Sequence, residues 1–280
     1  MDILLFKEER IYKMSILPPN QKHKPVDTPR NFFIYGQTMS GKSYLAERFP
    51  NPLFINTDGN ALAQSSPAIQ VRNVKSADGS KLTENVIDQL DKIVRALQNE
   101  KHTYETVVID VIDDITVMIE QAISIENGVK TIADVPYGKG FSLFNGILQQ
   151  FVMDLKALPM NVIYISRVSE INENNVTREV PSLKTKYYNI VNGNADLVIY
   201  TQKLGKRYIR RVTDRRKHYQ RDQIDDPKIL KILDNVSGVF DRPVPTTRKE
   251  QEQIVKKIEA TEDPIETEKI EQQNEKDGNK

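Results

Sequence analysis

The chain has 280 residues, 38% of them hydrophobic, and a formal net charge of +1, so it can hold one large domain or two small ones. A charge so close to zero does not by itself indicate a nucleic-acid or membrane partner. The absence of cysteine excludes disulfides, thiolate metal sites and cysteine nucleophiles, and the three scattered histidines give no reason to expect a histidine metal site.

Residues 1–30 are predicted to form an extended lead-in, because four prolines lie among polar residues in its second half. The extreme N-terminus lacks the basic region and cleavage site of a signal peptide. No apolar run approaches the roughly 20 residues that a membrane-spanning helix needs. We therefore expect a cytoplasmic protein with no membrane partner.

The most informative segment is GQTMSGKS, residues 36–43, which fits the pattern GxxxxGK[ST] at every fixed position. An apolar run over 31–35 predicts a strand before it, and residues 44–49 predict a helix start after it. Strand, glycine loop and helix are the context of a phosphate-binding loop. The residues expected to contact a nucleotide are Gly36, Gln37, Thr38, Met39, Ser40, Gly41, Lys42, Ser43 and Tyr44.

The loop's residue types match the needs of a bound triphosphate. Gly36 and Gly41 allow backbone N–H groups to approach the phosphate oxygens closely. The helix N-terminus and Lys42 supply positive charge, while the hydroxyl of Ser43 can ligate Mg²⁺. ATP and Mg²⁺ are therefore the expected ligands.

Two later strands are predicted to end in acids. Residues 53–56 are followed by Thr57, Asp58 and Gly59, and residues 106–109 are followed by Asp110. A carboxylate at the end of a buried strand downstream of a phosphate loop is the expected second ligand of Mg²⁺, and we assign Asp110 to it. Alone, Asp58 is typical of an ordinary turn aspartate.

Val111 occupies the position where many ATPases place a water-polarising glutamate. Hydrolysis needs a carboxylate within reach of the attacking water. Either Asp113 or Asp114 supplies it, or the acid comes from a neighbouring strand end, and Asp58 is then the obvious candidate.

The remaining elements alternate between helices and strands, which indicates a largely parallel sheet covered on both faces. Helices are expected over 83–100 with Thr83 as the N-cap, over 115–127 and over 142–158, with a mobile glycine-rich loop over 128–140. Strands are expected over 161–165, 196–200 and 207–212, and a hairpin or loop within 168–194. Arg167, just past one strand end, is either a sensor of the γ-phosphate or an ordinary surface arginine.

Basic residues crowd into residues 203–221, where they alternate with aromatic side chains. A solvated strand edge explains part of this. The functional alternatives are contact with nucleic-acid phosphates and a finger that reaches a neighbouring subunit's ATP. Residues 241–280 are rich in Glu, Gln, Lys and Thr and predict a disordered or partly helical tail. The basic residues are Lys203, Lys206, Arg207, Arg210, Arg211, Arg215, Arg216, Lys217 and Arg221.

With these motifs in place, residues 31–240 resemble a RecA-like ATPase domain, and in particular the phage-encoded RecA-like single-strand annealing proteins of the phage nucleotide-binding ATPase family. The resemblance implies an α/β P-loop NTPase fold with a RecA-like core. It implies that Asp58 polarises the attacking water, that Asp110 binds the metal, and that the segment with Arg215, Arg216 and Lys217 supplies basic fingers in trans. It also implies DNA-binding loops around 128–140 and after Arg167.

These observations lead to one main functional hypothesis and two rivals. The main hypothesis is a DNA-stimulated ATPase of the host cytoplasm that assembles as a ring or filament on single-stranded DNA and promotes annealing or homologous recombination. A single-strand-binding protein is a possible further partner. The rivals are another P-loop enzyme, such as a nucleotide kinase, and a loader or packaging partner that uses ATP as a switch.

Overall fold

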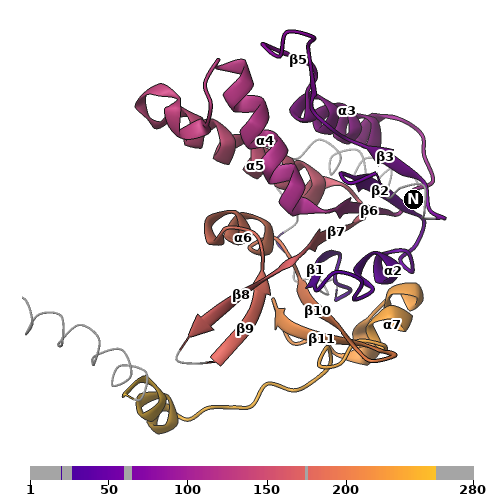
Figure 1. Cartoon of the computed structure of the whole chain (residues 1–280). Helices are drawn as coiled ribbons and strands as arrows, with labels where there is room; N and C mark the ends of the chain where they lie inside the picture. The colour runs from indigo at the N-terminus through magenta and orange to yellow at the C-terminus, as the bar shows by residue number, and fades with distance from the viewer. Residues whose placement is uncertain (1–19, 21–26, 60–64, 174–175, 257–280) are drawn as a thin grey trace, which may run out of the picture. The chain divides into compact units, whose positions relative to one another are not determined.

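The computed structural model describes residue 20 and residues 27–59, 65–173 and 176–256 (Figure 1). The chain divides into two compact units, residues 1–240 and 241–280. The expected lead-in over 1–30 lies mostly outside the described residues, as does the expected tail beyond residue 256. Within the second unit, residues 248–256 are helical.

A seven-stranded sheet forms the centre of the first unit, in the order β11-β10-β1-β7-β6-β2-β3. The strands from β10 to β3 pair in parallel, and only β11 at one edge is antiparallel to its neighbour. The expected α/β architecture with a mostly parallel sheet is therefore confirmed. The strands are β1 (Asn31–Gly36), β2 (Pro52–Asn56), β3 (Ala68–Gln70), β6 (Thr106–Asp110), β7 (Asn161–Ser166), β10 (Leu197–Leu204) and β11 (Arg207–Arg215).

Helices cover both faces of the sheet (Figure 1). One face packs against α3 (Val86–Asn99), α4 (Ile112–Glu126), α5 (Lys139–Ala157) and α6 (Thr185–Asn192), and the other against α2 (Lys42–Ala46) and α7 (Pro227–Leu233). Strand β1 illustrates why both faces are covered, since its alternate side chains are apolar and point to opposite faces of the sheet. Phe33 and Tyr35 belong to the first core, and Phe32 and Ile34 to the second.

Two antiparallel hairpins stand outside the central sheet. The first joins β4 (Val74–Lys75) and β5 (Leu82–Glu84), and the second joins β8 (Val168–Glu173) and β9 (Val176–Pro181). The second hairpin lies within the polar stretch where a hairpin or loop is expected. It is followed by α6, which the sequence pattern does not predict, because only two residues of this short helix are fully buried.

Helix starts differ from the predicted ones by two or three residues. The N-cap of α3 is Asn85, whose side chain accepts a hydrogen bond from the backbone N–H of Ile87 at 2.8 Å. Thr83, the predicted cap, lies in β5 and donates its hydroxyl to the carbonyl oxygen of Val74 instead. Helices α4 and α5 begin at Ile112 and Lys139, earlier than the apolar periodicity suggests.

Residues 128–140, where a mobile glycine-rich loop is predicted, contain two short 3-10 turns, Ile132–Asp134 and Pro136–Gly138. The side chains of Thr131 and Asp134 form a capping box, and Ile132 and Val135 are buried in the core. This segment is therefore anchored to the helices beside it. Tyr137, the middle residue of the second turn, is 95% exposed.

Two glycines of α5 give a matched test of this anchoring. A Cβ added at Gly140 would collide with the carbonyl oxygen of Ile132, whereas a Cβ at Gly146 would meet nothing within 4 Å. We predict that Gly140→Ala lowers the free energy of unfolding by about 2 kcal/mol through overpacking. Gly146→Ala should raise it by up to about 1 kcal/mol through helix propensity. Urea unfolding followed by circular dichroism measures both, and equal effects would contradict the packing described.

Candidate functional site

The parallel register brings the carboxyl ends of five strands to one edge of the sheet. Across it, Thr201 pairs with Gly36 of β1, and Tyr35 pairs with Ser166 of β7. Further along, Asp110 of β6 lies between its partners on β7 and β2. Open α/β sheets place their ligands at this edge. The predicted phosphate loop, Asp110, Arg167 and Asp58 all follow strands that end here.

The loop is fixed to strand β10 as well as to β1. A Cβ on Gly36 would collide with the carbonyl oxygen of Thr201, so only glycine allows this close approach. The hydroxyls of Ser40 and Thr201 are 2.6 Å apart and share a buried hydrogen bond. Gly41, whose φ is +85°, takes the left-handed conformation that glycine favours and leads into α2. The predicted phosphate loop therefore has a defined backbone geometry that depends on its two glycines.

Lys42, Ser43 and Asp110 meet beside this loop. The Lys42 ammonium donates hydrogen bonds to the carbonyl oxygens of Gly36 and Gln37, both at 2.8 Å. The Ser43 hydroxyl donates to a carboxylate oxygen of Asp110 at 2.7 Å. Burial lowers the pKa of Lys42, and the nearby Asp110 carboxylate opposes that effect. A hydroxyl and a carboxylate side by side, next to a triphosphate cradle, are suitable oxygen ligands for Mg²⁺.

Among the described residues there is no group of three or more His, Cys, Asp or Glu that could hold a metal by itself. Magnesium commonly keeps several waters and takes the rest of its ligands from one or two protein groups and the substrate phosphates. Ser43 and Asp110 therefore fit the ion in the presence of a nucleotide.

Asp113 and Asp114, in the first turn of α4, are both engaged by the end of β7. Asp113 accepts from the backbone N–H of Arg167 at 3.0 Å and from the Ser166 hydroxyl at 2.9 Å. It also accepts from the hydroxyl of Ser182. Asp114 forms a two-pronged ion pair with the Arg167 guanidinium, at 2.6 and 2.9 Å. The hydrogen bonds from Arg167 lower the pKa of Asp114, which makes it a weaker base.

Asp58 is the remaining candidate for the catalytic acid. It is exposed and lies two residues beyond β2, next to Thr57, which donates to Asp114 at 3.0 Å. The pKa of Arg167 is raised mainly by its hydrogen bonds with Asp114, and Asp58 adds a smaller electrostatic contribution. Asp58 thus belongs to the same charged cluster as Arg167.

The hairpin β8–β9 reaches the phosphate loop through Glu179. This carboxylate accepts hydrogen bonds from the Gln37 side chain and from the Tyr200 hydroxyl. The contact joins the loop, the hairpin and β10 at one point. No pattern in the sequence indicates it, because the donor and acceptor of the first bond are 142 positions apart.

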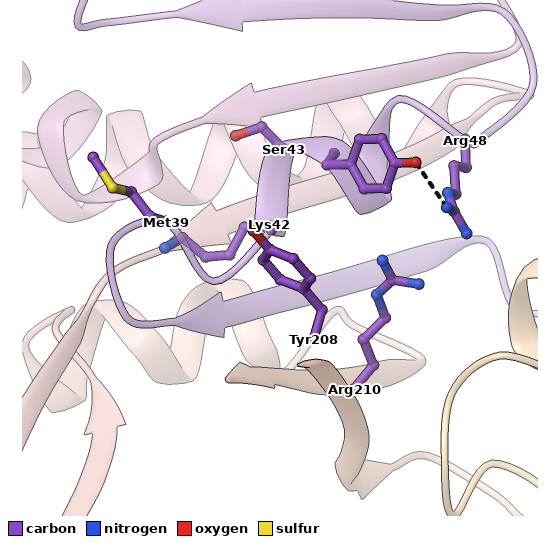
Figure 2. Close-up of a pocket in the computed structure, with 8 residues that line it drawn as sticks. Met39, Lys42, Ser43, Arg48, Tyr208 and Arg210 are labelled. Carbon is purple, nitrogen blue, oxygen red and sulfur yellow. Dashed lines mark hydrogen bonds between the residues drawn. The ribbon is translucent and has the colours of Figure 1, made fainter. Parts of the chain in front are cut away.

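A pocket of about 760 Å³ opens beside the loop, between α2 and the first residues of β11 (Figure 2). Tyr44 and Tyr208 line it, and each is more than half exposed. Aromatic rings beside a phosphate cradle provide stacking surfaces for a nucleotide base. Tyr44 is among the expected nucleotide contacts, whereas the sequence marks Tyr208 only as an aromatic residue of the basic segment. The pairing of β10 with β11 brings the Tyr208 ring so close to Gly41 that a Cβ added there would lie 3.2 Å from it.

The basic segment 203–221 divides into two parts with different surroundings. Arg215 donates to the carbonyl oxygens of Gly238 and Val239, Arg216 forms an ion pair with Asp196, and Lys217 forms one with Asp27. These three predicted fingers therefore have partners within their own chain, and their action in trans stays a prediction. Lys203, Lys206 and Arg207, around the turn between β10 and β11, are exposed, and none has an ion pair with an acid of the described residues.

A comparison with protein families finds that a family described as AAA domain matches residues 28–222. No protein of curated function matches the sequence. Among solved structures, the RadB recombinase aligns with 14% identity and a TM-score of 0.38, over 68% of this chain and 83% of that one. In the described part of the chain, no helix is both long and apolar enough to cross a bilayer.

Because the candidate acids have different surroundings, their substitution should have different effects. We predict that Asp58→Asn lowers the rate of ATP hydrolysis at least about 100-fold, the usual contribution of a general base, and leaves ATP affinity within a few-fold. Asp114→Asn should mainly release Arg167, at a cost of about 1 kcal/mol in stability because the pair is partly exposed. Single-turnover hydrolysis, nucleotide titration and thermal melting measure these effects. Parent-like hydrolysis by the Asp58 variant would exclude it as the base.

Proposed function

The chain belongs to the AAA domain family, and we propose that it binds and hydrolyses ATP with Mg²⁺ and couples this cycle to single-stranded DNA, promoting annealing or homologous recombination. The observation that carries the first half is the meeting of Lys42, Ser43 and Asp110 at the glycine cradle. The ammonium of Lys42 stabilises charge on the phosphates, and Mg²⁺, when bound, neutralises further charge as the γ-phosphate leaves. Together, these groups suit phosphoryl transfer from a nucleoside triphosphate.

In the proposed reaction, Asp58 accepts a proton from the water that attacks the γ-phosphate. Its exposure supports this role, since water can reach it from solvent. Arg167 is suited to sense the γ-phosphate, because its charge acts on Lys42 as well as on Asp114. A sensor in this position would exchange its ion pair with Asp114 for the phosphate and thereby shift the start of β8.

The DNA-binding half of the proposal rests on exposed aromatic and basic side chains. The ring of Tyr137 projects into solvent, and the Lys139 ammonium lies 5.8 Å from its centre. Proteins that bind single strands combine stacking rings with cations in this way. The turn with Lys203, Lys206 and Arg207 offers additional charge. Hairpin β8–β9 is a weaker candidate, because its sequence holds three glutamates and one arginine.

Assembly into a ring or filament on DNA is part of the proposal, with ATP bridging neighbouring subunits. Arg215, Arg216 and Lys217 remain candidates for the residues that reach the neighbour's nucleotide, and would have to leave their present partners to do so. A cytoplasmic location and contact with a single-strand-binding protein belong to the same proposal.

The first experiment compares ATP hydrolysis without DNA, with single-stranded DNA and with duplex DNA. We expect stimulation by the single strand and no turnover by Lys42→Ala, since removing the lysine removes several kcal/mol of phosphate stabilisation. Phosphate transfer to a nucleoside monophosphate would instead identify a nucleotide kinase. Hydrolysis that is indifferent to DNA would favour a loader or packaging role.

A second experiment tests the exposed ring. We predict that Tyr137→Ala weakens binding of oligothymidylate about tenfold, in line with the loss of one stacked base, and that Tyr137→Phe binds like the parent. Fluorescence anisotropy at two salt concentrations measures both, and affinity should fall as salt rises. Equal affinity of all three proteins would show that the strand does not stack on this ring.

A further inference from the structure

Two arginines stand at the far end of the nucleotide pocket from the phosphate loop. Arg48 follows α2, and Arg210 belongs to β11 (Figure 2). Both line the 760 Å³ pocket, and both also line a second cavity of about 410 Å³ that continues toward α7. Figure 2 shows their guanidinium groups reaching into the same space. The two cavities thus share a boundary, which is formed by two positively charged side chains.

Neither arginine has a carboxylate partner among the described residues. Arg48 donates to the neutral hydroxyl of Tyr44 at 3.0 Å and lies over the same ring. The Nε of Arg210 is buried and has no hydrogen-bond partner in the described part of the chain. Burial and the like charge of Arg48 both lower the pKa of Arg210. Arg48 is exposed and Arg210 is partly buried, and like charges that face each other, one of them partly desolvated, cost free energy unless an anion joins them.

The second cavity adds more positive charge and no acid to its lining. Lys228 and Lys231 of α7 lie along it, together with Asn235. Lys228 has a 3.4 Å ion pair with Glu105, but both side chains are largely exposed and such a pair contributes little. Glu47, the acid next to Arg48 in sequence, lines neither cavity. The charge of this region therefore suits a ligand that carries a negative group.

We propose that Arg48 and Arg210, extended by Lys228 and Lys231, form a second phosphate-binding subsite for a phosphate ester that lies beyond the nucleotide held by the phosphate loop. Paired guanidinium groups bind phosphate with two parallel hydrogen bonds each, a geometry that lysine alone does not give. Two sources have this chemistry: a 3′-phosphate on the ribose of the bound nucleotide, which ATP itself lacks, or the backbone of a nucleic-acid strand. The subsite rests on the proposed function only in that the pocket holds a nucleotide.

Calorimetric titration of the full chain tests the subsite without relying on hydrolysis. The probes are adenosine 5′-monophosphate, adenosine 3′,5′-bisphosphate and a short oligothymidylate. The proteins are the parent, Arg48→Gln/Arg210→Gln and the control Arg95→Gln, which removes an exposed arginine paired with Asp91 on α3. Arg48→Gln alone is included because Arg48 is exposed, so its replacement should not disturb folding even if the double variant does.

For the parent and the Arg95 control, we expect the bisphosphate to bind about 10- to 100-fold more tightly than the monophosphate, as charge-assisted hydrogen bonds imply. The double variant should bring this ratio close to one. If the ratio is one in every protein but oligothymidylate binds the double variant at least about tenfold more weakly, the phosphate belongs to a strand.

If neither comparison depends on the arginine pair, the subsite is overturned. Failure of the proposed function has a different signature, since it appears as absent ATP hydrolysis or absent stimulation by DNA in the parent protein. Both of those are measured independently of the bisphosphate ratio. The two proposals can therefore fail separately.

Discussion

The parallel hydrogen-bond register of the central sheet is the constraint on which the rest of the site depends. Because β10, β1, β7, β6 and β2 run in the same direction, residues that follow them in sequence meet at one edge. The buried side chains on both faces hold this register, since slipping any strand by one residue would turn its apolar side chains to the wrong core. The positions of the predicted phosphate loop, the proposed metal ligands and the charged cluster all depend on this register.

Local patterns predict the parts of the site that depend on short stretches of sequence. The loop, its lysine and serine, and the strand ending at Asp110 can be found because residue type and spacing carry the chemistry themselves. The choice among Asp58, Asp113 and Asp114 cannot be made in this way. It depends on Arg167, Ser166 and Ser182, which reach the two later acids from positions more than 50 residues away.

The roles of the basic residues 203–221 also cannot be predicted from local sequence. In the sequence these cations look equivalent. However, β11 runs antiparallel to β10, so the two ends of the segment lie at opposite ends of the strands. Leu204 pairs with Arg207 near the nucleotide pocket, while Leu197 pairs with Arg215 at the other end. Charge that looks like one patch in the sequence is therefore divided between a structural role and an open surface. Only the strand pairing shows which cations have a structural role and which lie on the open surface.

The ends of the sheet also bear on how copies of the chain can associate. An exposed edge strand has unpaired backbone N–H and C=O groups that can pair with a strand of another chain. Here β3 contributes only Ala68–Gln70 at one side, and at the other side the backbone of Ser237 already bonds with Arg210 and Val212 of β11. Outside this pairing, β11 has only two short runs, residues 207–209 and 213–215. In the proposed assembly, subunits are therefore expected to join through side chains and loops and not by extending one sheet across the interface.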